Sequence, residues 1–200
     1  MREIIASIDV GSHLIKLIVA EFIEEKMNIL CALTEESRGV KNGMIVEPEE
    51  VEYALKKILK KAEDLLNTSV KKVIVNVPEA ECMFKIGEAS LSITEEDREV
   101  SGEYIQKVLQ MSVKGNVEEG FDLVTVVPIM FKVDDRKTRI PLSMKGSSLS
   151  VKSVVISAPK KDIFLIAKSL EKCGVEVNDI MIPSIGSFYA HMESGMENNT

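Results

Sequence analysis

The residues with the clearest chemical potential lie in one short segment near the N-terminus. Asp9 ends an apolar run, and Gly11 and Ser12 follow it in a tight turn. Backbone N–H groups in such a turn can converge on a phosphate, and the Ser12 hydroxyl adds a donor. Asp9 suits a hydrated Mg²⁺ ion, which takes one or two carboxylates and keeps several waters, and Lys16 can reach a phosphate oxygen. The four residues together predict a phosphate site, although taken alone they also fit an ordinary hairpin turn.

The composition indicates a stable globular chain and argues against a nucleic-acid binder. Of 200 residues, 45% are hydrophobic and 28% are charged, and 25 basic against 32 acidic side chains leave a net charge of −7. Proteins that bind nucleic acid normally carry a basic excess. The apolar stretches are too short for a membrane-spanning helix, and the N-terminus does not resemble a signal peptide. Three widely spaced cysteines and two histidines suggest neither a disulfide framework nor a metal site, so we expect a cytoplasmic protein.

The periodicity of apolar residues predicts the order β-β-β-α-β at the start of the chain and α-β-α at its end. The strands are expected at residues 4–9, 14–22, 28–33, 73–77 and 175–181, and the helices at 48–66, around 163–170 and from 183 onward. The first three strands have short connections, which indicates an antiparallel meander, and the helices then cross over to parallel strands. In the last helix, the spacing places Ile185, Phe188, Tyr189 and Met192 on one inward face.

The middle of the chain, residues 81–158, breaks this rhythm. Here the sequence predicts a strand near 82–86, an amphipathic helix around 104–109 and two long strands at 123–133 and 149–157. The polar loop 134–148 between these strands is long enough that we expect it to be mobile. The sequence therefore predicts an α/β host, residues 1–80 with 159–200, and a small inserted α+β unit, residues 81–158.

In this topology, the Asp9–Ser12 turn resembles the phosphate-1 motif of the actin/Hsp70/sugar-kinase ATPases, whose fold is an RNase H-like mixed sheet. Three further segments are similar to the FtsA family of bacterial cell-division actins. These are the loop at residues 37–45, the strand at 124–133 with its insertion after the fourth strand, and the turn at 173–180. The resemblance implies that the host is the actin-like subdomain 1A and that the insertion is subdomain 1C.

The resemblance also assigns site residues, none of them catalytic. The implied phosphate-1 residues are Asp9, Gly11, Ser12, His13 and Lys16, and the implied hinge residues are Pro183, Ser184 and Gly186. Asp9 would hold Mg²⁺ through water. ATP and Mg²⁺ are the implied ligands of a full-length protein with at most weak ATPase activity. We expect the chain to be the first half of such a protein, without activity and without bound nucleotide.

The function implied by the resemblance is that of a cell-division scaffold. Such a protein polymerises, tethers the tubulin-like FtsZ ring to the inner face of the membrane at the division site and recruits later division proteins. The contacts with FtsZ and the membrane would lie in C-terminal parts that the chain is expected to lack, whereas subdomain 1C would serve self-association and the later proteins. Two alternatives stay open: an actin-like adaptor of type IV pilus assembly and a small-molecule kinase. The loop at residues 37–45 disfavours the former, and no phosphoacceptor pocket can be argued for the latter.

Overall fold

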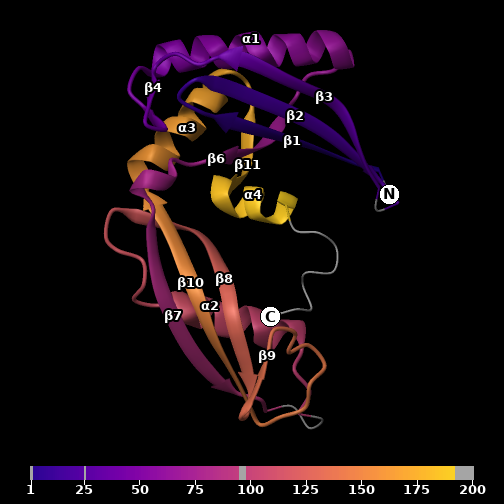
Figure 1. Ribbon diagram of the computed structural model, residues 1–200, viewed down its shortest axis with the longest axis vertical. Helices are drawn as coiled ribbons and strands as arrows, with labels where there is room; N and C mark the ends of the chain where they lie inside the picture. The colour runs from indigo at the N-terminus through magenta and orange to yellow at the C-terminus, as the bar shows by residue number, and fades with distance from the viewer. Residues whose placement is uncertain (1, 25, 95–97, 192–200) are drawn as a thin grey trace. The chain divides into compact units, whose positions relative to one another are not determined.

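The chain consists of two compact units (Figure 1). The computed structural model describes residues 2–24, 26–94 and 98–191. The host unit comprises residues 1–81 and 160–200, and the inserted unit comprises residues 82–159, one residue away from the boundaries that the sequence suggests. Each unit has its own sheet and its own hydrophobic core. Among the described residues, no helix is both long and apolar enough to cross a membrane.

The host unit is built on a five-stranded mixed sheet in the order β11-β6-β1-β2-β3. Strands β1, β2 and β3 form the expected antiparallel meander, while β6 and β11 run parallel to β1. The elements are β1 (Arg2–Val10), β2 (Leu14–Ile23), β3 (Lys26–Glu36), β4 (Val40–Lys41), β5 (Met44–Ile45), α1 (Pro48–Leu66), β6 (Lys72–Asn76), a short 3₁₀ turn (Glu79–Glu81), α3 (Lys160–Lys172), β11 (Glu176–Met181) and α4 (Pro183–His191). The predicted βββαβαβα order is thus present, and the two-residue hairpin β4–β5 is an addition to it.

The host core forms because alternate residues of the central strands face α1. Ile8 of β1 lies opposite Leu17 of β2, and both side chains are fully buried in one hydrophobic cluster with Leu55 and Ile58 of the helix. The helical positions i and i+3 lie on one face, as alternate strand positions do, so the two patterns bring the apolar side chains into one layer. Each such side chain contributes about 1.5–3 kcal/mol by its burial.

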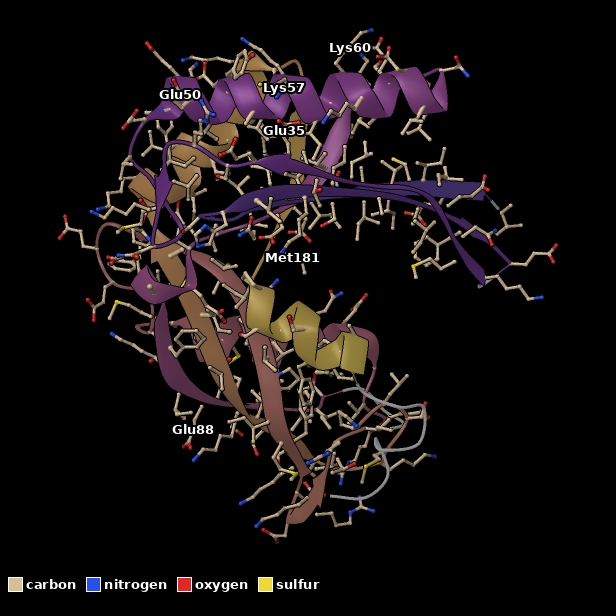
Figure 2. The ribbon with its side chains drawn as sticks, turned by 45° about the horizontal axis from the view of Figure 1, so that its top comes forward. Glu35, Glu50, Lys57, Lys60, Glu88 and Met181 are labelled. Carbon is tan, nitrogen blue, oxygen red and sulfur yellow. The ribbon has the colours of Figure 1, made fainter. Side chains whose placement is uncertain are left out.

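A carboxylate with two lysine partners ties the edge strand β3 to α1. The two oxygens of the buried Glu35 accept hydrogen bonds from Lys57 Nζ at 2.5 Å and from Lys61 Nζ at 2.6 Å (Figure 2). These hydrogen bonds, that of Lys57 foremost, lower the pKa of Glu35 to about 2, against the raising effect of burial. The carboxylate is therefore ionised at neutral pH and connects the strand to two successive turns of the helix.

The last helix, α4, differs from the prediction in its buried face. Phe188 and Tyr189 are 61% and 62% exposed and pack edge-on against each other, with ring centroids 5.6 Å apart. Ile185 is partly buried, and Met192 lies outside the described residues. The prediction that Phe188 and Tyr189 point inward is therefore wrong. Helical spacing shows that side chains share a face, but it does not supply an element to cover that face.

The inserted unit is a four-stranded antiparallel sheet with one helix on one face. Its elements are β7 (Met83–Ser92), α2 (Gly102–Val113), β8 (Phe121–Val133), β9 (Arg136–Thr138) and β10 (Ser148–Pro159), and the strand order is β7-β10-β8-β9. Strand β7 extends well beyond residue 86, where the sequence suggests that it ends. Val108 of α2 is fully buried among alternate residues of the sheet, such as Phe131 and Val151. This face of the sheet therefore forms a core of its own.

The end of α2 approaches the sheet very closely at Gly87. The hydroxyls of Ser112 on α2 and Ser153 on β10 lie 2.8 Å apart, and Ser153 Oγ donates to the carbonyl oxygen of Gly87 at 3.3 Å. A Cβ atom at Gly87 would collide with the carbonyl oxygen of Ser112. Glycine is thus required here by the packing of the helix on the strand.

In the segment 134–148, expected to be a mobile loop, Arg136–Thr138 form a short strand that pairs with the end of β8. This strand is β9, and Asp134 Oδ1 accepts hydrogen bonds from the backbone N–H groups of Ser147 at 2.9 Å and Ser148 at 3.0 Å. These amides lower the pKa of Asp134. Further along, the carbonyl of Met144 accepts from the N–H of Val100 at 2.9 Å. The segment therefore contains a short strand and several internal hydrogen bonds, and its mobility stays a prediction.

The Glu35 cluster predicts a pH-dependent stability. Since the pKa of Glu35 is lowered from 4.5 to about 2 on folding, the ionised form stabilises the fold above about pH 4.5, and this stabilisation is lost as the pH falls toward 2. Glu35→Gln should lower the free energy of unfolding by about 1–2 kcal/mol at pH 7 and by much less near pH 2. The matched control is Glu63→Gln, which removes an exposed partner of Lys60. Urea titrations that give the same loss for Glu35→Gln at both pH values would contradict the assignment.

The close approach at Gly87 predicts a cost for the smallest possible side chain. Gly87→Ala should lower the free energy of unfolding by about 1–3 kcal/mol, because α2 must move to admit the methyl group. Gly102, at the start of the same helix, has open space around it. Gly102→Ala is therefore the control and should be neutral or stabilising by up to about 1 kcal/mol. Equal effects of the two substitutions in chemical denaturation would refute this packing argument.

Candidate phosphate site

The turn between β1 and β2 brings four of the predicted site residues together. Gly11 N–H donates to the carbonyl oxygen of Leu14 at 3.2 Å, which closes the turn. Asp9 and Lys16 lie directly opposite each other in the two strands, and Lys16 Nζ is 2.9 Å from Asp9 Oδ2. Both side chains are partly exposed. The turn thus presents a carboxylate, an ammonium group and the hydroxyl of Ser12 at one end of the sheet.

The Ser12 side chain is fixed by the small hairpin β4–β5. Its Oγ accepts a hydrogen bond from the backbone N–H of Gly43 at 2.9 Å. Gly43 has a φ of +80°, a left-handed conformation that glycine adopts at no steric cost and most other residues avoid. Because Ser12 Oγ is the acceptor in this bond, its own hydrogen is left to donate to a ligand.

The available donors differ in one respect from the prediction. The N–H of Gly11 is used within the turn, so Gly11 gives the turn its shape and is not a free donor; a Cβ atom there would lie 2.9 Å from the carbonyl oxygen of Leu14. In the part of the chain that the structure describes, the N–H groups of Ser12 and His13 have no hydrogen-bond partner. His13 therefore belongs to the site through its backbone, and its carbonyl oxygen accepts from Ser37 N–H at 2.9 Å.

Asn76 is a member of the site that the sequence analysis missed. Its Oδ1 accepts a hydrogen bond from the N–H of Val10 at 2.7 Å, which joins the end of β6 to the end of β1. The two strands are parallel neighbours, so their carboxyl ends meet at one edge of the sheet, where ligands of α/β folds bind. The sequence signal that could have identified Asn76 is its place as a polar residue at the end of β6, the parallel neighbour of β1.

A second missed residue, Asp162, lies in the first turn of α3. Its side chain is buried and its Oδ2 has no hydrogen-bond partner in the structure, and burial raises its pKa, an effect that Lys161 opposes and Glu81 reinforces. Asp162 lines a cavity of about 10 Å³ together with Gly43 and Asn76. A space of this size is about that of one water molecule. Nothing in the sequence marks Asp162 as a site residue, because a carboxylate in the first turn of a helix is ordinary.

The predicted hinge residues lie on α4 and contact other parts of the host unit. Ser184 Oγ donates to the carboxylate of Glu79. A Cβ atom at Gly186 would lie 2.6 Å from the methyl group of Met181, the flexible end of a side chain on β11 (Figure 2). Pro183 begins the helix. Gly186 is thus crossed by Met181, and the hinge role of the three residues stays a prediction.

The residues at the turn fit a hydrated magnesium ion. Within the described residues, Asp9 Oδ1 has no partner, while Oδ2 pairs with Lys16. The structure shows no group of three or more His, Cys, Asp or Glu side chains that could hold a metal, a statement limited to the described ranges. One carboxylate with water and phosphate oxygens is the ligand set that Mg²⁺ commonly takes. Asp9 is therefore a suitable water-mediated ligand.

Comparison with a solved structure gives the class of the fold. The chain superposes on the PilM–PilN type IV pilus biogenesis complex with a TM-score of 0.63 at 12% identity, over 92% of this chain and 49% of that one. At this identity the likeness concerns the fold. The mixed βββαβαβα sheet, the tight turn after β1 and the unit inserted after β6 are those of an actin-like α/β fold.

The family follows from sequence comparisons. Residues 84–157, within the inserted unit, match the family model described as the SHS2 domain inserted in FtsA. Cell division protein FtsA of Staphylococcus epidermidis is 31% identical over 179 residues, which cover 87% of this chain and 38% of that protein. FtsA of Bacillus subtilis is 25% identical over 198 residues, or 98% of this chain and 45% of that protein. The chain belongs to the FtsA family of cell-division proteins and spans about two fifths of the length of these relatives.

Proposed function

We propose that this chain is the nucleotide-binding and docking part of an ATP-binding division scaffold. The observation that carries the proposal is the β1–β2 turn, in which Asp9, Ser12 and Lys16 converge at the carboxyl end of the central strand of an actin-like sheet. Membership in the FtsA family supports the cell-division role. ATP and Mg²⁺ are the ligands that this donor set suits.

The chain's own residues would bind phosphate from one side. The N–H groups of Ser12 and His13 and the Ser12 hydroxyl donate to phosphate oxygens, and Lys16 adds a positive charge beside them. Asp9 orients water around the magnesium ion, which neutralises phosphate charge when it is bound. We assign no catalytic residue here, so the nucleotide acts mainly as a conformational ligand, with weak turnover at most.

The remaining parts of the proposal concern partners. The full-length protein polymerises, links the FtsZ ring to the inner face of the cell membrane at the division site and recruits later division proteins. We place the FtsZ and membrane contacts outside these 200 residues, and self-association and docking in the inserted unit. That unit has its own sheet and core, which supports a separate binding role.

The nucleotide site is tested by Lys16→Ala in the full-length protein. Loss of a charged hydrogen bond of about 1.5–3 kcal/mol should weaken Mg-ATP binding about 10- to 100-fold in calorimetry, and ATP-dependent sedimentation of polymer should fall with it. Lys60→Ala, which removes an exposed lysine on α1, is the matched control and should leave both unchanged. Unaltered ATP affinity in Lys16→Ala would overturn the assignment of the site.

A further inference from the structure

The inserted sheet has a second face, opposite α2, that carries a concentration of lysines. Lys132 on β8, Lys137 on β9 and Lys152 on β10 line a shallow hollow of about 680 Å³. The register places them on this face, because their neighbours Val133 and Val151 point into the core under α2. The rest of the lining is small or apolar apart from Glu88. We call this set the lysine hollow; its remaining members include Ser90, Met130 and Ser150.

The charges in the lysine hollow are poorly balanced within the protein itself. Lys132 and Lys137 lie directly opposite each other in the β8–β9 pair, and neither has a carboxylate partner among the residues that the structure describes. Lys152 pairs with Glu88 at 3.2 Å. Like charges directly opposite each other destabilise a sheet. The chain has a net charge of −7, so acidic residues are plentiful, yet two lysines face each other in this pair. The stability of the fold therefore does not account for the Lys132–Lys137 pair.

Apolar side chains continue the same face along the strands. Phe84 and Ile86 of β7 are each 52% exposed, and Ile86 lies opposite Val154, which in turn lies opposite Val127 of β8. Along β10, Ser150 lies opposite Lys132, and Val154 lies opposite Ile86. These two positions of β10 are four residues apart, so the apolar row begins about 13 Å from the lysine row. Single exposed apolar residues are common, but two adjacent rows next to a basic hollow form a continuous two-part surface.

We propose that this face binds an acidic segment of another protein, with carboxylates over the lysine hollow and apolar side chains over Phe84 and Ile86. A small anion would satisfy the lysines but leave the apolar rows in water. An anionic membrane surface is disfavoured as the ligand, because the chain carries a net charge of −7. This proposal rests on the docking role proposed above for the inserted unit and adds the chemistry of the partner. It does not depend on nucleotide binding.

The test uses a 12-residue fluorescent peptide with glutamates in one half and alternating leucine and phenylalanine in the other. Anisotropy should show saturable binding to the protein that weakens as salt is raised. The double substitution Lys132→Glu with Lys137→Glu should weaken binding about tenfold, and Phe84→Ser should also weaken it. The control Lys107→Glu reverses an exposed lysine on α2 and should change nothing.

A stability measurement separates lost binding from lost structure. Lys137→Glu replaces a like-charge cross-strand pair by an opposite-charge pair, so the melting temperature should rise by about 1–2 °C while peptide affinity falls. A fall in both would mean that the substitution damages the sheet. The affinity would then carry no information about the lysines, and the Lys132→Glu single variant, judged by the same pair of readouts, would decide.

Several results would overturn the proposal. The first is equally tight binding of a peptide that has lysines in place of the glutamates. The second is displacement of the peptide by inorganic phosphate added at the same concentration of negative charge as the peptide. The third is absence of peptide binding together with binding to phosphatidylserine vesicles that the double variant loses. Self-association that the double variant abolishes in the absence of peptide would assign the face to a second copy of the chain. Lys16→Ala should leave peptide binding intact, so a failure here is distinguishable from a failure of the nucleotide site.

Discussion

The rest of the host unit depends on the pairing of β1, which is antiparallel to β2 on one side and parallel to β6 on the other. Its antiparallel contact with β2 places Asp9 opposite Lys16 across a tight turn, and its parallel contact with β6 places Asn76 beside Val10. Alternation along the same strand buries Ile8 under α1. A single register therefore sets both the core and the candidate phosphate site, since a shift by one residue would exchange the two faces.

The inserted unit can exist because its two ends are neighbours. Met83 at its start lies opposite Ser157 near its end in the β7–β10 pair, so the host chain is interrupted at one point of its surface. Each unit then satisfies its own apolar residues. The inserted sheet uses one face for α2 and leaves the other with an unbalanced pair of lysines, which is the arrangement expected of a module whose second face binds something else.

Long periodic elements could be predicted from the sequence, and details set by tertiary contacts could not. Helix α1 has the predicted bounds, because its apolar spacing is regular over five turns and proline stands at its start. The hairpin β4–β5 is too short to show a period, yet it holds Ser12. Asn76 and Asp162 reach the site only through the parallel register and the start of α3. The turn itself was predicted, but the use of the Gly11 N–H within it was not.

The host unit, centred on β1, folds around a core to which the inserted unit contributes none of the clustered residues. The direct measurement is urea unfolding, followed by circular dichroism, of residues 1–200 in which residues 82–159 are replaced by a short Gly/Ser linker. We expect one cooperative transition with a smaller m-value than that of the intact chain, because less surface is exposed on unfolding. A gradual loss of signal without a cooperative transition would contradict it.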